Sequence, residues 1–428
     1  MPAVADALAH AEDLAAFVAA SPSSFHAAAH VAARLTDAGF TLLSEDEPWP
    51  AVRGGRFAVV RDGAVIAWVA PEGATGQTPV RVFGAHSDSP GFKLKPQPTT
   101  GKLGWLQAGV EIYGGPLLNS WLDRELRLAG RLVLDDGSSV LTATGPLLRL
   151  PQLAIHLDRE ANDHLALDKQ TQTQPVWGLG EADSADLLGE LAREAGVDAA
   201  RIRGYDIVTA DAARGAVFGL DDVFFASGRL DDLASVHAGV AALERAADGF
   251  DADHIAMLAV FDHEEVGSGT RSGAAGPFLS DVLERVWLGL GADREQQLRA
   301  LAASWCVSSD VGHAVHPNYP HKHDPVVQPK LGGGPILKIN ANQRYATDAV
   351  GAAAWNGWCD AAGVVSQEFV SNNAVPCGST IGPITATRLG MRTVDVGIPI
   401  LSMHSARELA GVSDLWDLQR VAEVFFRG

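Results

Sequence analysis

Basic residues are scarce in this chain relative to acidic ones. Its 428 residues include 33 Lys and Arg against 52 Asp and Glu, which gives a formal net charge of −19. Proteins that bind nucleic acids or anionic membranes neutralise phosphates with clustered Lys and Arg side chains. The deficit therefore predicts that neither nucleic acid nor a membrane is a partner of this protein.

Cysteines and long apolar runs are also rare. The three cysteines, Cys306, Cys359 and Cys377, form no Cys-x-x-Cys pair, so we expect neither a disulfide framework nor a thiolate metal cluster. Acidic residues interrupt the apolar N-terminal segment, and no predominantly apolar run is long enough to span a bilayer. We therefore expect a soluble cytoplasmic protein.

The composition and the hydrophobic periodicity of the sequence change twice along the chain. Residues 1–92 combine two Ala-rich helical segments with short β-branched runs, and residues 224–428 alternate helical patterns with fully apolar runs such as IAMLAVF. Residues 93–223 instead show β-alternation around Asp136-Gly137, a hairpin signal. We predict an α/β catalytic domain, built from residues 1–92 and 224–428 around a mostly parallel sheet flanked by helices, with a β-rich domain of residues 93–223 inserted into it.

Acidic and histidine residues follow the predicted buried strands of the α/β part, and one acidic residue precedes a predicted helix. The carboxyl ends of parallel strands meet at one crevice, so side chains distant in sequence should converge there. The residues at these positions are His86, Asp231, Glu264, Glu265, Asp310 and His404.

Nitrogen and oxygen ligands without cysteine suit Zn²⁺, Co²⁺ or Mn²⁺. A single catalytic zinc needs about three protein ligands, whereas this set offers more, so two ions sharing a bridging carboxylate fit better. Glu264 is then left as a general base, and Asp88 can hold the second ring nitrogen of His86. Any one of these carboxylates alone is more often a solvated loop or cap residue. The prediction depends on their joint placement.

A second group of histidines, His313, His316, His321 and His323, crowds one Pro-containing loop. A solvated surface loop explains this group as well as a metal tract does, so we do not count its members as ligands. Motifs of other enzyme classes are absent, including H-E-x-x-H, G-x-S-x-G, G-x-G-x-x-G and the P-loop.

Ten motifs, in order from about residue 17 to the C-terminus, resemble those of the aspartyl aminopeptidases, the M18 family of metallopeptidases. These motifs are GAHSDSPGFKLKP, EIYGG, WLDRELRLAGR, LPQLAIHLDRE, SGRLDDL, FDHEEVGS, SSDVGHAVHPNYP, ILKINANQRYATD, PCGSTIGPI and MHSARELA. The sequence departs slightly from the family pattern at Asp232 and His263, where relatives commonly have Asn.

The resemblance implies a di-zinc exopeptidase fold with an inserted dimerisation domain, in a tetrahedral homododecamer. It places the zinc ligands at His86, Asp231, Glu265, Asp310 and His404, with Asp231 bridging the two ions, and the catalytic base at Glu264. It also implies substrate contacts by a further set of residues, the last of which reaches a neighbouring subunit's site. These are Lys338, Tyr345, His313 and His156.

The implied reaction removes an N-terminal Asp or Glu from a peptide by attack of a water held between the two ions, with Glu264 taking its proton. The substrate's acidic side chain would meet Lys338; residue statistics alone favour an ordinary exposed strand-end lysine here, and the resemblance reverses that weighting. Two alternatives stay open. One is a related zinc aminopeptidase or N-acyl amidohydrolase of other specificity, and the other is a non-catalytic oligomeric scaffold.

Overall fold

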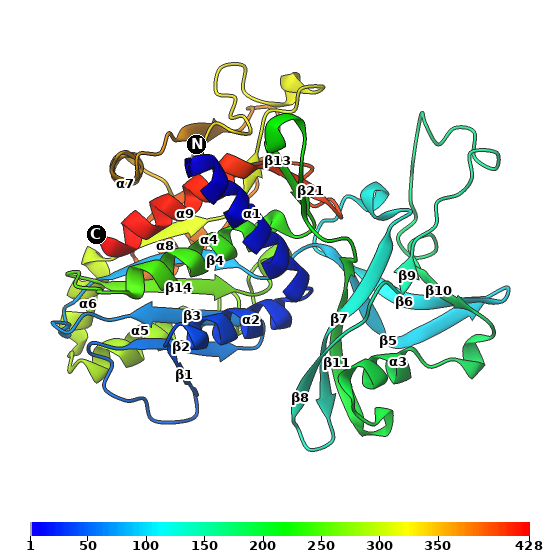
Figure 1. Ribbon diagram of the computed structural model, residues 1–428, viewed down its shortest axis with the longest axis horizontal. Helices are drawn as coiled ribbons and strands as arrows, with labels where there is room; N and C mark the ends of the chain where they lie inside the picture. Colours follow the sequence, from blue (N-terminus) through cyan, green and yellow to red (C-terminus); the bar gives the residue numbers. More distant parts are fainter. Residues whose placement is uncertain (1) are drawn as a thin grey trace.

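The computed structural model describes residues 2–428, with side chains from residue 4 onward. Two bodies lie side by side: a large sheet covered by helices, and a smaller β-rich body formed by the middle of the chain (Figure 1). No helix among the described residues is long and apolar enough to cross a membrane.

The large body is built on a nine-stranded sheet in the order β1-β2-β3-β14-β4-β15-β19-β17-β18. Its centre, from β14 through β4 and β15 to β19, is parallel, and β3 and β17 pair antiparallel with their neighbours on either side of this centre. The predicted mostly parallel sheet is thereby confirmed. The strands are β1 (Thr41–Leu43), β2 (Arg56–Arg61), β3 (Ala64–Val69), β4 (Val80–His86), β14 (Ile255–Phe261), β15 (Trp305–Ser309), β17 (Ile336–Ile339), β18 (Gln367–Val370) and β19 (Arg392–Gly397).

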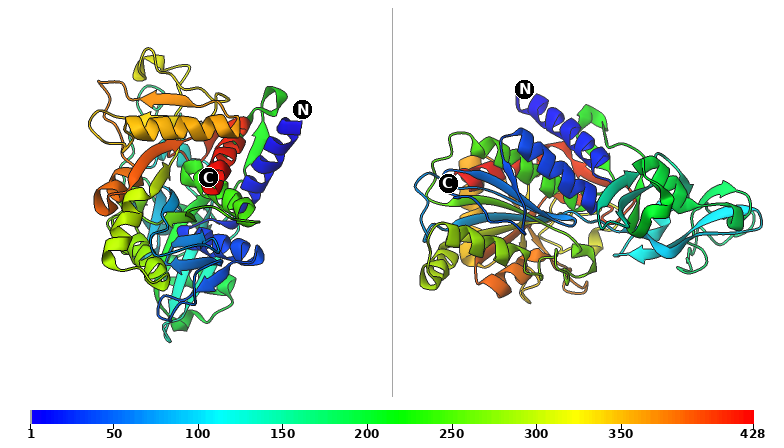
Figure 2. Two further views of the ribbon diagram at one scale, coloured as in Figure 1. Left: turned by 90° about the vertical axis from the view of Figure 1, so that its left-hand side faces the viewer. Right: turned by 90° about the horizontal axis from the view of Figure 1, so that it is seen from below.

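Helices cover both faces of this sheet (Figure 2). Successive side chains of a strand point to opposite faces, so Leu258 of β14 packs into one apolar cluster and Met257 into the other. This explains why the central strands are continuous apolar runs. One face carries α1 (Pro2–Ala20), α2 (Ser24–Asp37), α4 (Leu230–Ala247), α7 (Ala349–Ala362) and α9 (Val412–Arg427), and the other α5 (Phe278–Gly289), α6 (Arg294–Ala303) and α8 (Ile381–Leu389).

The smaller body contains a seven-stranded antiparallel sheet and the helix α3 (Leu187–Ala195). Strand β7 pairs with both β9 and β11, so six of the strands close into a ring. The strands are β5 (Gly91–Lys102), β6 (Trp105–Tyr113), β7 (Glu125–Leu134), β8 (Ser139–Ala143), β9 (Leu148–Arg149), β10 (Val176–Leu179) and β11 (Ile202–Asp211). The hairpin predicted at Asp136-Gly137 joins β7 to β8.

A long arm, residues 151–175, projects from the smaller body between β9 and β10 and contains turns but no helix or strand (Figure 1). Its apolar side chains are unusually exposed, with Leu153 58% and Leu157 75% accessible. Exposed apolar side chains gathered on one segment indicate a surface that contacts another molecule.

A third sheet, in the order β12-β13-β21-β20-β16, lies beside the main one. The sequence predicts that His404 directly follows a buried strand of the α/β part. The structure corrects this: β19 ends at Gly397, and the chain then forms β20 in the third sheet. His404 therefore comes from this smaller sheet. Its strands are β12 (Ala216–Phe218), β13 (Phe224–Ser227), β16 (Gly312–His313), β20 (Pro399–Leu401) and β21 (Glu408–Gly411).

Candidate metal centre

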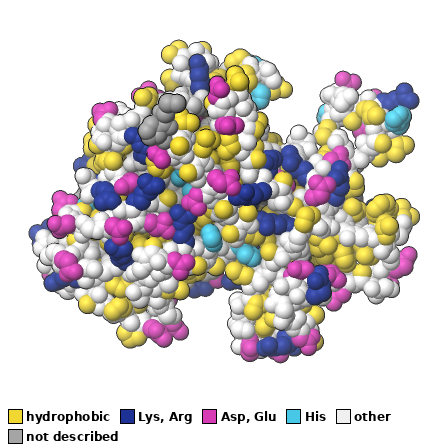
Figure 3. All heavy atoms as spheres, in the orientation of Figure 1, with side chains coloured by type: hydrophobic (Ala, Val, Ile, Leu, Met, Phe, Trp, Pro, Cys, Tyr) yellow, Lys and Arg dark blue, Asp and Glu magenta, His cyan; other side chains and the backbone are white. Residues whose placement is uncertain are grey.

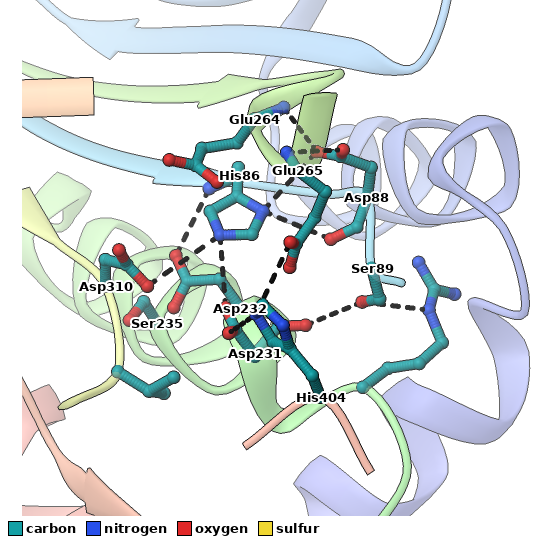
Figure 4. Close-up of polar contacts among 12 residues, drawn as sticks. His86, Asp88, Ser89, Asp231, Asp232, Ser235, Glu264, Glu265, Asp310 and His404 are labelled. Atoms are coloured by element: carbon teal, nitrogen blue, oxygen red, sulfur yellow. Dashed lines mark hydrogen bonds and ion pairs between the residues drawn. The ribbon is translucent and has the colours of Figure 1, made fainter. Parts of the chain in front are cut away.

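The six acidic and histidine residues predicted to converge do so at the carboxyl edge of the main sheet (Figure 4). His86 ends β4, Asp310 directly follows β15, and the pair Glu264-Glu265 forms a short turn of 3₁₀ helix after β14. These three strands are adjacent and parallel, which brings their ends together. The remaining two, Asp231 at the start of α4 and His404 after β20, close the cluster from the side.

Asp231 lies between two halves of this cluster. Its Oδ1 is 3.2 Å from Nε2 of His86, and its Oδ2 is 3.3 Å from Nε2 of His404. On the first side, Oδ1 of Asp310 is 3.8 Å from the same nitrogen of His86, and on the second, Oε2 of Glu265 is 3.4 Å from Nε2 of His404. The Asp231 carboxylate thus offers one oxygen to a group with His86 and Asp310, and the other oxygen to a group with Glu265 and His404.

The electrostatics of the cluster favour a bound cation. Burial raises the pKa of Glu264 to about 7 and that of Glu265 well above its ordinary value, with Asp231 adding to the second shift. Burial alone would lower the pKa of His404, but the contact with Asp231 raises it to about 9. Several carboxylates are therefore held where ionisation is costly unless positive charge is supplied.

Unpartnered oxygens provide the test of whether these residues fit a metal. Oδ1 of Asp231 and Oε1 of Glu265 are buried and have no hydrogen-bond partner among the described residues. Buried carboxylate oxygens are normally hydrogen-bonded or coordinate a metal. The donor set, two imidazoles and several carboxylates, fits divalent zinc or a similar ion.

Asp88 contacts both His86 and the turn that carries Glu264 and Glu265. Its Oδ1 accepts a hydrogen bond from the backbone N–H of Glu264 at 3.0 Å. Its Oδ2 accepts two hydrogen bonds, one from the backbone N–H of Glu265 at 3.1 Å and one from the hydroxyl group of Tyr113 at 2.7 Å. Nδ1 of His86 lies 3.1 Å from the Asp88 carbonyl oxygen and 3.4 Å from its Oδ1. The predicted contact with the imidazole is present, but the carboxylate also fixes the turn that carries both glutamates.

Two further buried carboxylates were not predicted from the sequence. Glu408, 2% exposed, accepts hydrogen bonds from the backbone N–H of Asp231 at 3.0 Å and of His404 at 2.7 Å, and so fixes both. Asp232 accepts the backbone N–H of His86 at 3.2 Å. The sequence offered two signals for these residues: a glutamate at the start of an otherwise apolar strand, and a second aspartate directly after Asp231.

His263, one of the two departures from the family pattern, begins the turn that carries Glu264. It has φ of 63°. This left-handed conformation is best tolerated by Gly and Asn, so Asn would fit this position with less strain than His.

Lys338 and its neighbours lie on the Asp310 side of the cluster. Lys338 is only 2% exposed, and its Nζ donates to the Val311 carbonyl oxygen at 2.8 Å and lies 3.6 Å from Oδ2 of Asp310. It is therefore not the exposed strand-end lysine that residue statistics favour. The ring centroid of Tyr345 is 5.4 Å from the ammonium. Tyr345 and the exposed His313 both line a cavity of about 230 Å³.

The structure does not bring His156 to this cluster. This histidine is exposed on the arm formed by residues 151–175, in the smaller body. Within one chain it has no part in the site.

A mostly parallel α/β sheet with imidazoles and carboxylates gathered at its carboxyl edge defines the class of metal-dependent hydrolases. A family model described as Aminopeptidase I zinc metalloprotease (M18) matches residues 17–426. The chain belongs to this M18 family, as the resemblance in its motifs predicted, and is a metalloaminopeptidase.

Similar proteins agree with this assignment. The chain is 53% identical over 409 residues to the "Probable M18 family aminopeptidase 2" of Streptomyces coelicolor, covering 95% of this chain and 94% of the relative. It is 44% identical to the protein of the same name from Mycobacterium tuberculosis, with 95% of each chain covered.

Solved structures share the whole fold. A chain of the Ape4 and Nbr1 complex superposes with a TM-score of 0.95 at 34% identity, covering 99% of this chain and 86% of that one. The mApe1 dodecamer of S. cerevisiae gives a TM-score of 0.85 at 29% identity, covering 97% and 96%.

Proposed function

We propose that this metalloaminopeptidase binds two divalent ions, most simply Zn²⁺, and removes acidic residues from the N-termini of peptides. The observation that carries the proposal is the position of Asp231, whose two oxygens face His86 and His404 separately. One ion would be held by His86, Asp231 and Asp310, and the other by Asp231, Glu265 and His404. Co²⁺ or Mn²⁺ could occupy the same nitrogen and oxygen set.

When bound, the ions would lower the pKa of water and polarise the scissile carbonyl group. Glu264 supplies the proton transfers. Its backbone is fixed by Asp88, and burial raises its pKa, which makes the carboxylate a better proton acceptor. The proton that Glu264 takes from the attacking water passes to the departing amine, so the residue is regenerated after each cycle.

Lys338 would select the acidic side chain. Its ammonium is buried beside Asp310, so a carboxylate brought near it would be attracted in a partly desolvated space. The neighbouring cavity lined by His313 and Tyr345 gives this side chain room. A neutral N-terminal residue would leave the ammonium without that added partner.

Self-association is the second part of the proposal. The similar mApe1 structure is a dodecamer, and the arm of residues 151–175 exposes apolar side chains that a second copy of the chain could cover. We propose that the smaller body forms the contacts of a tetrahedral homododecamer and that His156 acts in a neighbouring subunit's site.

The remaining features of the proposal follow from charge and chemistry. The net charge of −19 disfavours nucleic acid as a partner. All three cysteines are free, which fits a reducing cytoplasm.

Metal analysis paired with a panel of substrates tests the function directly. We expect two ions per subunit, and faster hydrolysis of Asp- and Glu-peptides than of neutral peptides. Preference for neutral N-termini would identify a zinc aminopeptidase of other specificity, and preference for acylated amino acids an amidohydrolase. Absence of metal and of hydrolysis after reconstitution with zinc or cobalt would favour a scaffold.

A further inference from the structure

Two arginines at the junction of the two bodies have no acidic partner. Arg127, on β7, and Arg229, in the loop before α4, line one cavity of about 60 Å³ together with the end of α1 and the end of β11. Figure 3 shows basic side chains gathered where the two bodies meet. Neither guanidinium forms an ion pair with any residue that the structure describes.

Both guanidinium groups also carry an unused donor. Nε of Arg127 and Nη1 of Arg229 are buried without a hydrogen-bond partner among the described residues. The hydrogen bonds that their other nitrogens make go to neutral oxygens: Nη2 of Arg127 donates to the Ala19 carbonyl at 2.9 Å, and Nη2 of Arg229 to that of Ser87 at 2.6 Å. Burial lowers the pKa of Arg229 to about 10, and repulsion by Arg127 adds to this shift. Unpaired buried charges of this kind are costly.

The acidic residue that lines the cavity is already paired with other arginines. Asp211 lines the cavity, but its Oδ2 lies 3.6 Å from Nη1 of Arg124 and 3.7 Å from Nη1 of Arg407. Arg214, at the exposed mouth of the cavity, is paired with Glu12. Among the described residues no carboxylate therefore forms an ion pair with Arg127 or Arg229, and Asp88 and Asp262 act on Arg229, as Asp211 does on Arg127, only at longer range.

We propose that this cavity binds a small inorganic anion of about the size of chloride. The cavity volume of about 60 Å³ is several times the volume of about 10–15 Å³ that a single water requires, so the cavity can admit a small anion together with water. Water alone would satisfy the free N–H groups but would leave both guanidinium groups without an ion-pair partner. The anion reaches the cavity past the exposed Ala213 and Arg214.

The bound anion would also steady the loops that carry the metal centre. Nε of Arg229 lies 3.4 Å from the Ser89 hydroxyl oxygen, and that hydroxyl donates to the Asp231 carbonyl oxygen at 2.6 Å. Together with the bond to Ser87, these contacts tie the segment after β4 to the turn before α4. An anion that holds the Arg229 guanidinium in place would reduce the freedom of both segments. Binding of the anion itself does not depend on the proposed function.

Bromide provides the direct probe, because it scatters anomalously and replaces chloride. Crystals of the metal-loaded, full-length protein grown with bromide should show an anomalous peak between the guanidinium groups of Arg127 and Arg229. A cavity that contains only water under these conditions would overturn the proposal.

Thermal unfolding of the metal-loaded protein provides the second measurement. At constant ionic strength, replacing a bulky organic anion by chloride should raise the midpoint by about 1–3 °C, through binding to the folded state. Arg127→Gln should remove this response, whereas Arg299→Gln, which changes an exposed arginine of α6, should keep it. An equal chloride response in Arg127→Gln, or a response to phosphate without one to chloride, would contradict a chloride-sized site. If Arg127→Gln does not fold, the bromide peak in the unmodified protein still decides the question.

Discussion

The ammonium of Lys338 lies 3.6 Å from Oδ2 of Asp310, and the lysine is almost fully buried. A buried lysine beside Asp310 places a fixed positive charge at the edge of the candidate metal centre. The same ammonium donates to the Val311 carbonyl oxygen, so it is held in place from two sides.

Replacing Lys338 should therefore change the choice of substrate more than the chemistry. We expect Lys338→Met to lower kcat/KM for an Asp-peptide by about 10- to 100-fold, the value of one charge-assisted hydrogen bond, with a smaller loss for an Ala-peptide. Lys330→Met, at an exposed lysine before the same strand, is the control. Equal losses for both peptides would assign the selectivity to other residues.

The second prediction concerns Glu264 as the proton carrier. Glu264→Gln keeps the shape of the side chain but removes its capacity to accept a proton, so kcat should fall by about 100- to 10,000-fold. Metal content, measured by atomic emission, should stay at its normal value, and Glu368→Gln on the exposed side of β18 should be fully active. Near-normal turnover in the Glu264 variant would mean that another group is the base.

A third prediction separates positioning from chemistry at Asp88. In Asp88→Asn, the amide cannot accept hydrogen bonds from both glutamate N–H groups, so the turn carrying Glu264 and Glu265 should loosen. We expect metal affinity to fall by about 10- to 100-fold together with kcat. Tyr113→Phe, which removes one hydrogen bond to the same carboxylate, should cost much less. Unchanged metal affinity in Asp88→Asn would contradict the positioning role.

Subunit mixing tests the proposed place of His156. If this histidine serves a neighbouring site, co-expression of His156→Ala with Glu264→Gln should restore activity, because some sites combine an intact His156 with an intact Glu264. His164→Ala changes another histidine on the same exposed arm and is the matched control, which should be active without any second variant. Mixed oligomers that form but remain inactive would count against a role across subunits.

The fifth prediction concerns pH and lies outside the site. Burial lowers the pKa of His26 to about 4, with Arg229 and Arg127 adding to the shift. As pH falls below about 6.5, the unfolded chain takes up this proton before the folded one, so the stability that depends on a neutral His26 is lost between about pH 6.5 and 4. The midpoint of thermal unfolding should fall less steeply over this range in His26→Gln. The control His321→Gln, at an exposed histidine, should show the same pH dependence as the unmodified protein. If the unfolding midpoint changed equally with pH in all three proteins, the lowered pKa of His26 would be refuted.

The main elements of the fold are predictable from the sequence because its patterns are strong. A fully apolar run such as residues 255–261 is typical of a strand buried on both faces, and the residues that follow such strands then lie at one edge of the sheet. This local rule is sufficient to place His86, Glu264, Glu265 and Asp310 together.

The route to His404 illustrates what local patterns miss. Gly397 and Pro399 interrupt the apolar run and mark the end of a strand, but they do not show that the chain enters another sheet, since β19 and β20 are both largely buried. Only the pairing of β20 with β16 and β21 shows this, and such pairing depends on strands that are distant in sequence.

By itself, the sequence determined the class of fold and the acidic and imidazole donors, because composition and periodicity express those properties residue by residue. Only the tertiary structure decided that Asp231 stands between two groups, that Glu408 fixes two of its neighbours, that Lys338 is buried beside Asp310, and that Arg127 and Arg229 share one cavity. Each of these is a distance between segments remote in the chain, and such distances are set by packing rather than by local preference.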